Sequence, residues 1–242
     1  MKLFCTSDIH SFFTPFKKAL DEVGFDPNNE EHYLIVCGDC FDRGEESVEL
    51  LYYLMSLERK IIIKGNHDIL FDDLCMREFP YSYDFSNGTA KAVYDLGGSP
   101  SFDEGCRNAW NKTAAYRASL VNYFETKNYI FCHSWIPLAY SNMRKHYDPE
   151  WRAAGQSAWD QAMWGNPFEL AAQELNQTGK TIIFGHWHTS WPRHHWEGKP
   201  EFTEGADFSP YFGEDIIGLD ACTAHTGKVN VLVLEDDFLS NK

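Results

Sequence analysis

Five short apolar runs of the chain each end at a cluster of Asp, Asn or His residues. The runs cover residues 2–6, 32–37, 60–64, 129–132 and 181–184. Such runs, separated by helix-like segments at 15–23, 47–57 and 168–177, predict buried parallel strands in a layered α/β fold. Because ligands in such folds gather at the carboxyl ends of the strands, we expect the five clusters to converge on one edge.

The five clusters contain the residue types that bind divalent metals. They are Asp8-Ile9-His10, Gly38-Asp39-Cys40-Phe41-Asp42-Arg43-Gly44, Gly65-Asn66-His67-Asp68, Cys132-His133 and Gly185-His186-Trp187-His188. Carboxylate, imidazole and amide oxygen together suit ions such as Mn²⁺, Fe²⁺ or Zn²⁺. Each motif alone has a simpler interpretation, because Asp-x-His and Asn-His-Asp are also good cap or turn sequences. Their combination, each after a strand, favours a metal centre.

The spacing of these side chains predicts two metal sites that share one carboxylate. Asp8 and His10 can project from one loop onto one ion, and Asp39 can bridge two ions. The remaining candidates for the second ion are Asn66, His133 and His186, and His188 can turn back to the first. Two such ions lower the pKa of a bound water and neutralise the oxygens of an in-line displacement. We therefore predict a metal-dependent phosphoesterase.

The rest of the chain predicts insertions around a single domain that spans residues 1–242. The stretch 72–127 is rich in Tyr, Phe, Asn and Gly, with helical spacing at 107–124, and predicts a helical and irregular insertion. A second helical insertion is expected at about 138–161. Residues 187–213 suggest a long loop. Closing strands are expected at 216–219 and 229–234, possible partners in a hairpin around 226–227.

Charge and hydropathy exclude several classes of protein. The net charge of −15 argues against duplex DNA or anionic membranes as partners. No apolar stretch approaches the roughly 20 residues of a membrane span, and the first residues suggest a strand rather than a signal peptide. We therefore expect a cytoplasmic protein with reduced thiols, including Cys37 and Cys40. The acidic segment 235–237 is expected to be a solvated end.

With these motifs in this order, the chain resembles the calcineurin-like metallophosphoesterases. Within that superfamily it is most similar to the bacterial and phage-type Ser/Thr protein phosphatases and the symmetrical diadenosine tetraphosphate hydrolases. The similarity is dense from residue 4 to about 70 and returns at 130–134, 183–188 and 217–234. It implies a four-layer β-sandwich flanked by helices, with helical cap-like insertions, and a centre of two divalent metals, Mn²⁺ foremost and Fe or Zn as alternatives.

The resemblance also implies roles for individual residues. One metal would take Asp8, His10 and Asp39, and the other Asp39, Asn66, His133 and His186. His67 would be the general acid, a role that suits a group with a pKa near neutrality. Asp42 would orient His67, and Arg43 would bind the phosphoryl oxygens, with Asn66 and His67 also facing the substrate. Asp68 stands where the protein phosphatases commonly have Glu.

Two positions depart from the protein-phosphatase pattern. His188 adds a second histidine to the last motif, as in the wider superfamily. The second phosphate-binding arginine is missing, because Trp164-Gly165-Asn166 ends in an amide, so Asn166 or one of Arg144, Arg152 and Arg117 would have to replace it.

Three functional hypotheses remain from the sequence. The first is a Ser/Thr-type protein phosphatase. The second is a hydrolase of dinucleoside polyphosphates or other nucleotides, whose base a Trp near the motifs could cover. The third is a non-catalytic phospho-binding protein, which the intact set of ligands and His67 disfavours.

Overall fold

The chain folds around two five-stranded sheets. The computed structural model describes residues 1–236. The first sheet has the order β12-β1-β2-β3-β4, in which β1 to β4 are parallel and β12 is antiparallel to β1. Its strands are β1 (Lys2–Thr6), β2 (His32–Cys37), β3 (Lys60–Ile63), β4 (Leu120–Val121) and β12 (Leu232–Glu235). The three central strands lie where the apolar runs predict them.

The second sheet has the order β10-β11-β9-β6-β5, with β11, β9 and β6 parallel. Its strands are β5 (Phe124–Glu125), β6 (Tyr129–Phe131), β9 (Thr181–Phe184), β10 (Tyr211–Phe212) and β11 (Ile216–Gly218). The apolar runs thus divide between the two sheets, and the motifs that follow them approach one site from both sheets.

The inner faces of the two sheets pack on each other. Alternate residues of β1 and β2, such as Leu3 and Ile35, share a buried cluster with Phe131 and Ile183 of the second sheet. The outer faces are covered by helices, of which α1 (Phe13–Glu22) and α2 (Ser47–Ser56) pack on the first sheet. On the second sheet, α9 (Pro167–Ala172) and α10 (Ser190–Glu197) contribute the covering residues. The predicted four-layer α/β fold is confirmed.

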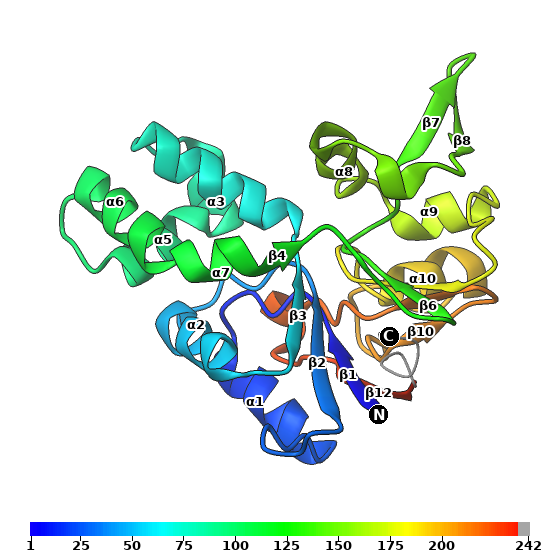
Figure 1. The fold of residues 1–242 in the computed structure, drawn as a ribbon, viewed down its shortest axis with the longest axis horizontal. Helices are drawn as coiled ribbons and strands as arrows, with labels where there is room; N and C mark the ends of the chain where they lie inside the picture. The colour runs from blue at the N-terminus through cyan, green and yellow to red at the C-terminus, as the bar shows by residue number, and fades with distance from the viewer. Residues whose placement is uncertain (237–242) are drawn as a thin grey trace.

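The first predicted insertion forms a helical lobe on one side of the sheets (Figure 1). It contains α3 (Asn66–Arg77), α4 (Ser82–Asn87), α5 (Thr89–Gly97), α6 (Phe102–Lys112) and α7 (Ala114–Ser119). The expected helix over 107–124 is corrected, because the helices end at Ser119 and the chain then adds β4 and β5 to the two sheets.

Three further expectations about local structure were wrong. The second insertion begins not with a helix but with a hairpin of β7 (Leu138–Ser141) and β8 (Arg144–Tyr147). The hairpin projects beside α8 (Gln156–Ala162) in Figure 1, and the 3-10 helix η1 (Trp151–Ala153) lies between the two in the chain. The 187–213 stretch contains α10, whose Pro192 falls in the first turn, where its missing N–H costs no helical hydrogen bond. The turn at 226–227 closes no hairpin, since α11 (Thr223–Thr226) lies there and β11 and β12 belong to different sheets.

Smaller differences concern helix ends and the acidic terminus. The helix expected over 168–177 is α9, which ends at Ala172. Asp236 is buried, and its Oδ2 accepts a hydrogen bond from the Thr126 hydroxyl, so the end is not simply solvated there; residue 237 lies outside the described residues. The seven cysteines are free thiols. No helix within residues 1–236 has the length and apolarity that crossing a membrane requires.

Candidate metal centre

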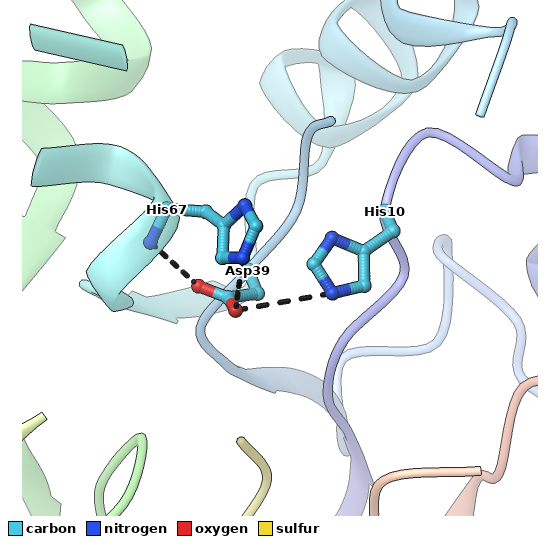
Figure 2. A group of neighbouring side chains, drawn as sticks. All are labelled: His10, Asp39 and His67. Carbon is cyan, nitrogen blue, oxygen red and sulfur yellow. Dashed lines mark hydrogen bonds and ion pairs between the residues drawn. The ribbon is translucent and has the colours of Figure 1, made fainter. Parts of the chain in front are cut away.

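The predicted ligands meet at the seam between the two sheets. Asp8, Asp39 and Asn66 follow β1, β2 and β3 of the first sheet, while His133 and His186 follow β6 and β9 of the second. Figure 2 shows His10, Asp39 and His67 pointing toward one another, with both histidine rings facing the Asp39 carboxylate. All the motifs therefore converge, as the strand-end argument predicts.

The backbone at these motifs is unusual. Six of the predicted site residues have left-handed backbone conformations, with φ between 49° and 81°: Asp8, His10, Asp39, Asp42, Arg43 and His186. Such a conformation costs roughly 1–2 kcal/mol for a residue with a side chain, and it persists only where the surroundings enforce it. The ends of β1, β2 and β9 turn sharply in this way, at Asp8, Asp39 and His186.

The first group of possible metal ligands contains His10, Asp39 and His67, whose donor atoms lie within 4.8 Å of one another. Asp8 adjoins this group, and His67 is the member that the resemblance makes the general acid and not a ligand. His10 Nδ1 donates to the Phe41 carbonyl at 2.9 Å, so Nε2 keeps a lone pair. This Nε2 lies 3.9 Å from Asp39 Oδ2 and 3.9 Å from Asp8 Oδ1. Asp8, His10 and Asp39, which the resemblance assigns to one ion, therefore lie close together, and their ligation of a metal stays a prediction.

The second ligand group consists of Asp39, His133 and His186, again within 4.8 Å. Asn66 Oδ1 lies 2.8 Å from His133 Nε2 and 2.9 Å from His186 Nδ1. His133 Nδ1 donates to the Cys37 carbonyl at 2.8 Å, which aims Nε2 at Asp39 Oδ2, 3.4 Å away. Asp39 belongs to both groups, as expected for a bridging carboxylate.

The electrostatics of the buried cluster fit a divalent cation. Burial, and then the Asp220 carboxylate, raises the pKa of Asp8 well above its usual value. Burial acts against charge on Asp39 too, but His133 and His67 outweigh it and lower the Asp39 pKa. Burial likewise opposes a proton on His133, yet Asp39 raises the His133 pKa to about 9. A proton on His133 thus supplies positive charge that a metal ion would supply in its place.

The pKa of His186 shifts in the opposite direction to that of His133. Burial, and then repulsion from His133, lowers the pKa of His186 to about 3, so its ring is neutral at pH 7. Its Nε2 is buried without a hydrogen-bond partner. A neutral imidazole among carboxylate and amide oxygens is the form that ligates a metal, so this donor set fits the predicted ions.

Beside the ligands lies a hydrogen-bonded pair suited to proton transfer. Asp42 Oδ2 accepts from His67 Nδ1 at 2.6 Å and from the Thr89 hydroxyl at 2.7 Å. His67 Nε2 is directed toward Asp39 Oδ2, 3.9 Å away, and lies 3.5 Å from Arg43 Nη2. Burial disfavours the imidazolium, but Asp39 and Asp42 outweigh burial and raise the His67 pKa.

Asp68 and Gly65 hold the strand-to-helix turn that carries Asn66 and His67. Asp68 Oδ2 accepts the Gly65 N–H at 2.8 Å, and its Oδ1 accepts the Tyr116 hydroxyl at 2.8 Å. A Cβ at Gly65 would lie 2.0 Å from Asp39 Oδ1, so only glycine lets the bridging carboxylate approach this closely.

The structure does not bring His188 to the other six predicted ligands. Its Nδ1 lies 2.9 Å from the Ser190 hydroxyl and its Nε2 lies 3.5 Å from Glu201. The His188 ring packs against Phe202, with ring centres 4.6 Å apart. His194, His195 and Glu201 form a third, more exposed group of possible metal-binding side chains.

Three of the four candidates for the missing phosphate-binding arginine have other partners. Asn166 caps α9, where its side chain accepts from the N–H groups of Phe168 and Glu169. Arg152 pairs with Glu125, and Arg117 stacks over Trp110 with its guanidinium 3.3 Å from the ring centre. Arg144 lies on the exposed hairpin strand β8.

Sequence reasoning missed three residues of the site. Thr89 and Tyr116 come from the first insertion, whose irregular sequence gives no signal for contacts with Asp42 and Asp68. Asp220 is different, because it follows β11 as the other clusters follow their strands. Burial raises the Asp220 pKa to about 6, and its carboxylate interacts with Arg43, Asp39 and His133. The strand-end rule could have found Asp220.

Part of the chain is similar in sequence to curated proteins of known activity. The chain is 39% identical over 70 residues to the symmetrical bis(5′-nucleosyl)-tetraphosphatase of Buchnera aphidicola subsp. Acyrthosiphon pisum, a match that covers 28% of this chain and 25% of that protein. It is 36% identical over 70 residues to the same enzyme of Thioalkalivibrio sulfidiphilus. The chain thus spans about a quarter of the length of the curated relatives it matches.

Solved structures share the fold over nearly the whole chain. A crystal structure described as a candidate diadenosine tetraphosphatase has a TM-score of 0.57 at 17% identity, covering 96% of this chain and 89% of the other. A cold-active protein tyrosine phosphatase has a TM-score of 0.53 at 14% identity, covering 97% and 73%. The calcineurin-like phosphoesterase family model matches residues 1–227, where the ligand motifs lie. The predicted resemblance is confirmed, and the chain belongs to the calcineurin-like phosphoesterase family.

Proposed function

We propose that the protein hydrolyses a phosphate ester or anhydride at a dinuclear divalent metal centre. The observation that supports this most is the pair of buried ligand groups that share Asp39. One ion would be held by Asp8, His10 and Asp39, and the other by Asp39 together with Asn66, His133 and His186. When bound, the two ions supply an activated water and neutralise charge on the phosphoryl oxygens.

His67 is the general acid in this proposal. Its Nδ1–H is held by Asp42 at 2.6 Å, which leaves Nε2 to carry the proton that the leaving oxygen takes. Arg43 lies beside it, with Nη2 3.5 Å from His67 Nε2, so its guanidinium can bind phosphoryl oxygens next to the leaving group. Asp42, buried and fixed by Thr89, keeps the ring in one orientation.

For the substrate, we infer a dinucleoside polyphosphate or related nucleotide in preference to the phosphoprotein that the sequence first suggested. Two observations support this choice. The curated relatives are named as hydrolases of bis(5′-nucleosyl) tetraphosphates. In addition, three of the four candidates to replace the second phosphate-binding arginine of the protein phosphatases, Arg117, Arg152 and Asn166, have other partners, and the fourth, Arg144, lies on the exposed hairpin strand β8.

A panel of substrates tests the proposal. The protein with Mn²⁺ is assayed on p-nitrophenyl phosphate, phosphopeptides and diadenosine tetraphosphate. We expect the protein to hydrolyse diadenosine tetraphosphate with the highest kcat/KM of the three substrates. His67→Asn should keep both metals and lose roughly 10²–10⁴ in kcat, the weight of a general acid. Two bound metals with no turnover of any substrate would instead support a phospho-binding protein.

Whether His188 is a metal ligand stays a prediction. Counting bound Mn²⁺ in His188→Ala decides it. A fall from two ions to one, as in a His10→Ala control, would show ligation by His188.

A further inference from the structure

A pocket of about 510 Å³ lies between the 202–209 segment and the chain that follows β11. Its volume falls within the roughly 300–1,000 Å³ typical of small-molecule sites. None of the predicted metal ligands lines it, and the proposed reaction uses none of its lining residues. Phe202, Phe208 and His225 supply its aromatic lining.

The three rings of this pocket form an open aromatic cluster. The ring centres of Phe202 and Phe208 lie 6.1 Å apart, and His225 lies 5.6 Å from Phe202 and 5.7 Å from Phe208. Phe202 nevertheless remains 47% exposed. The aromatic surface of Phe202 is therefore available to a planar apolar group, which would gain by stacking on it.

Polar groups at the same pocket can select such a group. The Asn230 amide donates both of its hydrogens to carbonyls, at 2.7 Å to Phe208 and 2.9 Å to Leu219, so its Oδ1 remains an acceptor. Lys228 also lines the pocket and has no carboxylate partner within residues 1–236, whereas Asp207, the acidic lining residue, is paired with Arg193 at 3.0 Å. An unpaired ammonium beside aromatic rings suits a ligand that is both planar and anionic.

The pocket is joined to the metal centre by two short segments. Ala221, one of its lining residues, follows Asp220, whose carboxylate interacts with Arg43 and Asp39. Thr223, two residues further on, donates its hydroxyl to the Asp8 carbonyl at 2.8 Å. On the other side, the ring of His188, two residues after His186, packs on Phe202.

We propose that this pocket binds the nucleobase of a nucleoside phosphate whose phosphate chain reaches the metal centre. The proposal rests on the proposed phosphohydrolase function and extends it to the substrate class. The rings of Phe202 and Phe208 stack on the base, Asn230 accepts a hydrogen bond from its exocyclic group, and Lys228 neutralises part of the phosphate chain. His188 supports the ring of Phe202 from behind.

The test compares two anhydride substrates with and without a nucleoside. KM is measured with Mn²⁺ for diadenosine tetraphosphate and for inorganic tripolyphosphate. Phe202→Ala should raise KM for diadenosine tetraphosphate by about 5- to 150-fold, the weight of one stacked base, and leave tripolyphosphate unchanged. Phe202→Trp should restore the wild-type KM. Phe212→Ala is the matched control, because Phe212 is a 61% exposed phenylalanine outside the pocket.

The experiments distinguish an incorrect assignment of the base-binding pocket from an incorrect proposed function. If wild-type protein hydrolyses tripolyphosphate and Phe202→Ala leaves KM for diadenosine tetraphosphate unchanged, the pocket is not a base site. If wild-type protein hydrolyses no phosphate substrate, the proposed function fails, and ADP binding by titration calorimetry tests the pocket on its own. Weaker ADP binding in Phe202→Ala than in Phe212→Ala would uphold the pocket, and equal binding would overturn it.

Discussion

Replacing Asp42 by Asn tests the proposed acid directly. The substitution keeps the size of the side chain and an oxygen that can still accept from His67 Nδ1. It removes the negative charge that lies 2.6 Å from that nitrogen. Asp42 is 1% exposed, so water screens this interaction little, and the change should reach the imidazolium almost undiminished.

The structure sets the size of the effect. A hydrogen bond to a charged group contributes roughly 1.5–3 kcal/mol. If this energy holds the proton on His67 and aligns the ring in the transition state, its loss corresponds to about 10- to 150-fold in rate. The loss should appear only when the leaving group needs a proton, because that is the one step His67 is proposed to assist.

The assay therefore compares two leaving groups. With Asp42→Asn, kcat on phenyl phosphate should fall about 10- to 150-fold, and kcat on p-nitrophenyl phosphate should fall much less, since nitrophenolate leaves without protonation. Thr89→Val is the matched control: it removes the other hydrogen bond to Asp42 Oδ2 but keeps the negative charge beside His67. The difference in kcat loss between the two substrates should therefore be smaller than in Asp42→Asn. Equal losses on both substrates would refute the assignment of His67 as the acid held by Asp42.

Three further perturbations have defined outcomes. Asp39→Asn removes the carboxylate common to both ligand groups, so metal content by mass spectrometry and activity should be lost together. Gly88→Ala places a Cβ 2.3 Å from the Arg43 backbone nitrogen at a φ of +85°, and we expect a loss of about 1–2 kcal/mol in unfolding free energy. The substitution should also raise KM for p-nitrophenyl phosphate, an increase in KM that the exposed Gly179→Ala should not show. Burial raises the pKa of Asp68 to about 7 from 3.8, so the folded state binds this proton more tightly than the unfolded state does. The unfolding free energy should therefore fall as pH rises from about 4 to 7. In metal-free protein, Asp68→Asn should reduce the decline in melting temperature over this pH range.

The sequence was most informative where local pattern and chemistry coincide. The runs at 2–6, 32–37 and 181–184 match β1, β2 and β9 in full, because an apolar run bounded by turns has few other solutions in a folded chain. The polar residues that follow each run lie at the seam for the same reason, since a strand end fixes where the next side chain points.

The parts that the sequence did not predict depend on long-range pairing. Nothing local distinguishes β6 and β9 from strands of the first sheet, because partner choice is a property of packing faces such as Phe131 and Ile183. The hairpin of β7 and β8 has Asn142 and Met143 at its turn, both with positive φ, where Gly would have given a clear signal. The aromatic pocket likewise joins Phe202 and His225, residues from segments that were not predicted to meet.

The location of the proposed ligands on the seam would make metal binding a link between the two sheets. Asp8, Asp39 and Asn66 come from one sheet and His133 and His186 from the other, so neither sheet can hold the second ion alone. Any motion that separates the layers would then release this ion, and its binding free energy would stabilise the packing of the two sheets by mass action. Chelation should therefore loosen the interface between the sheets first, and faster amide exchange in β2 and β9 than in α1 would be its signature.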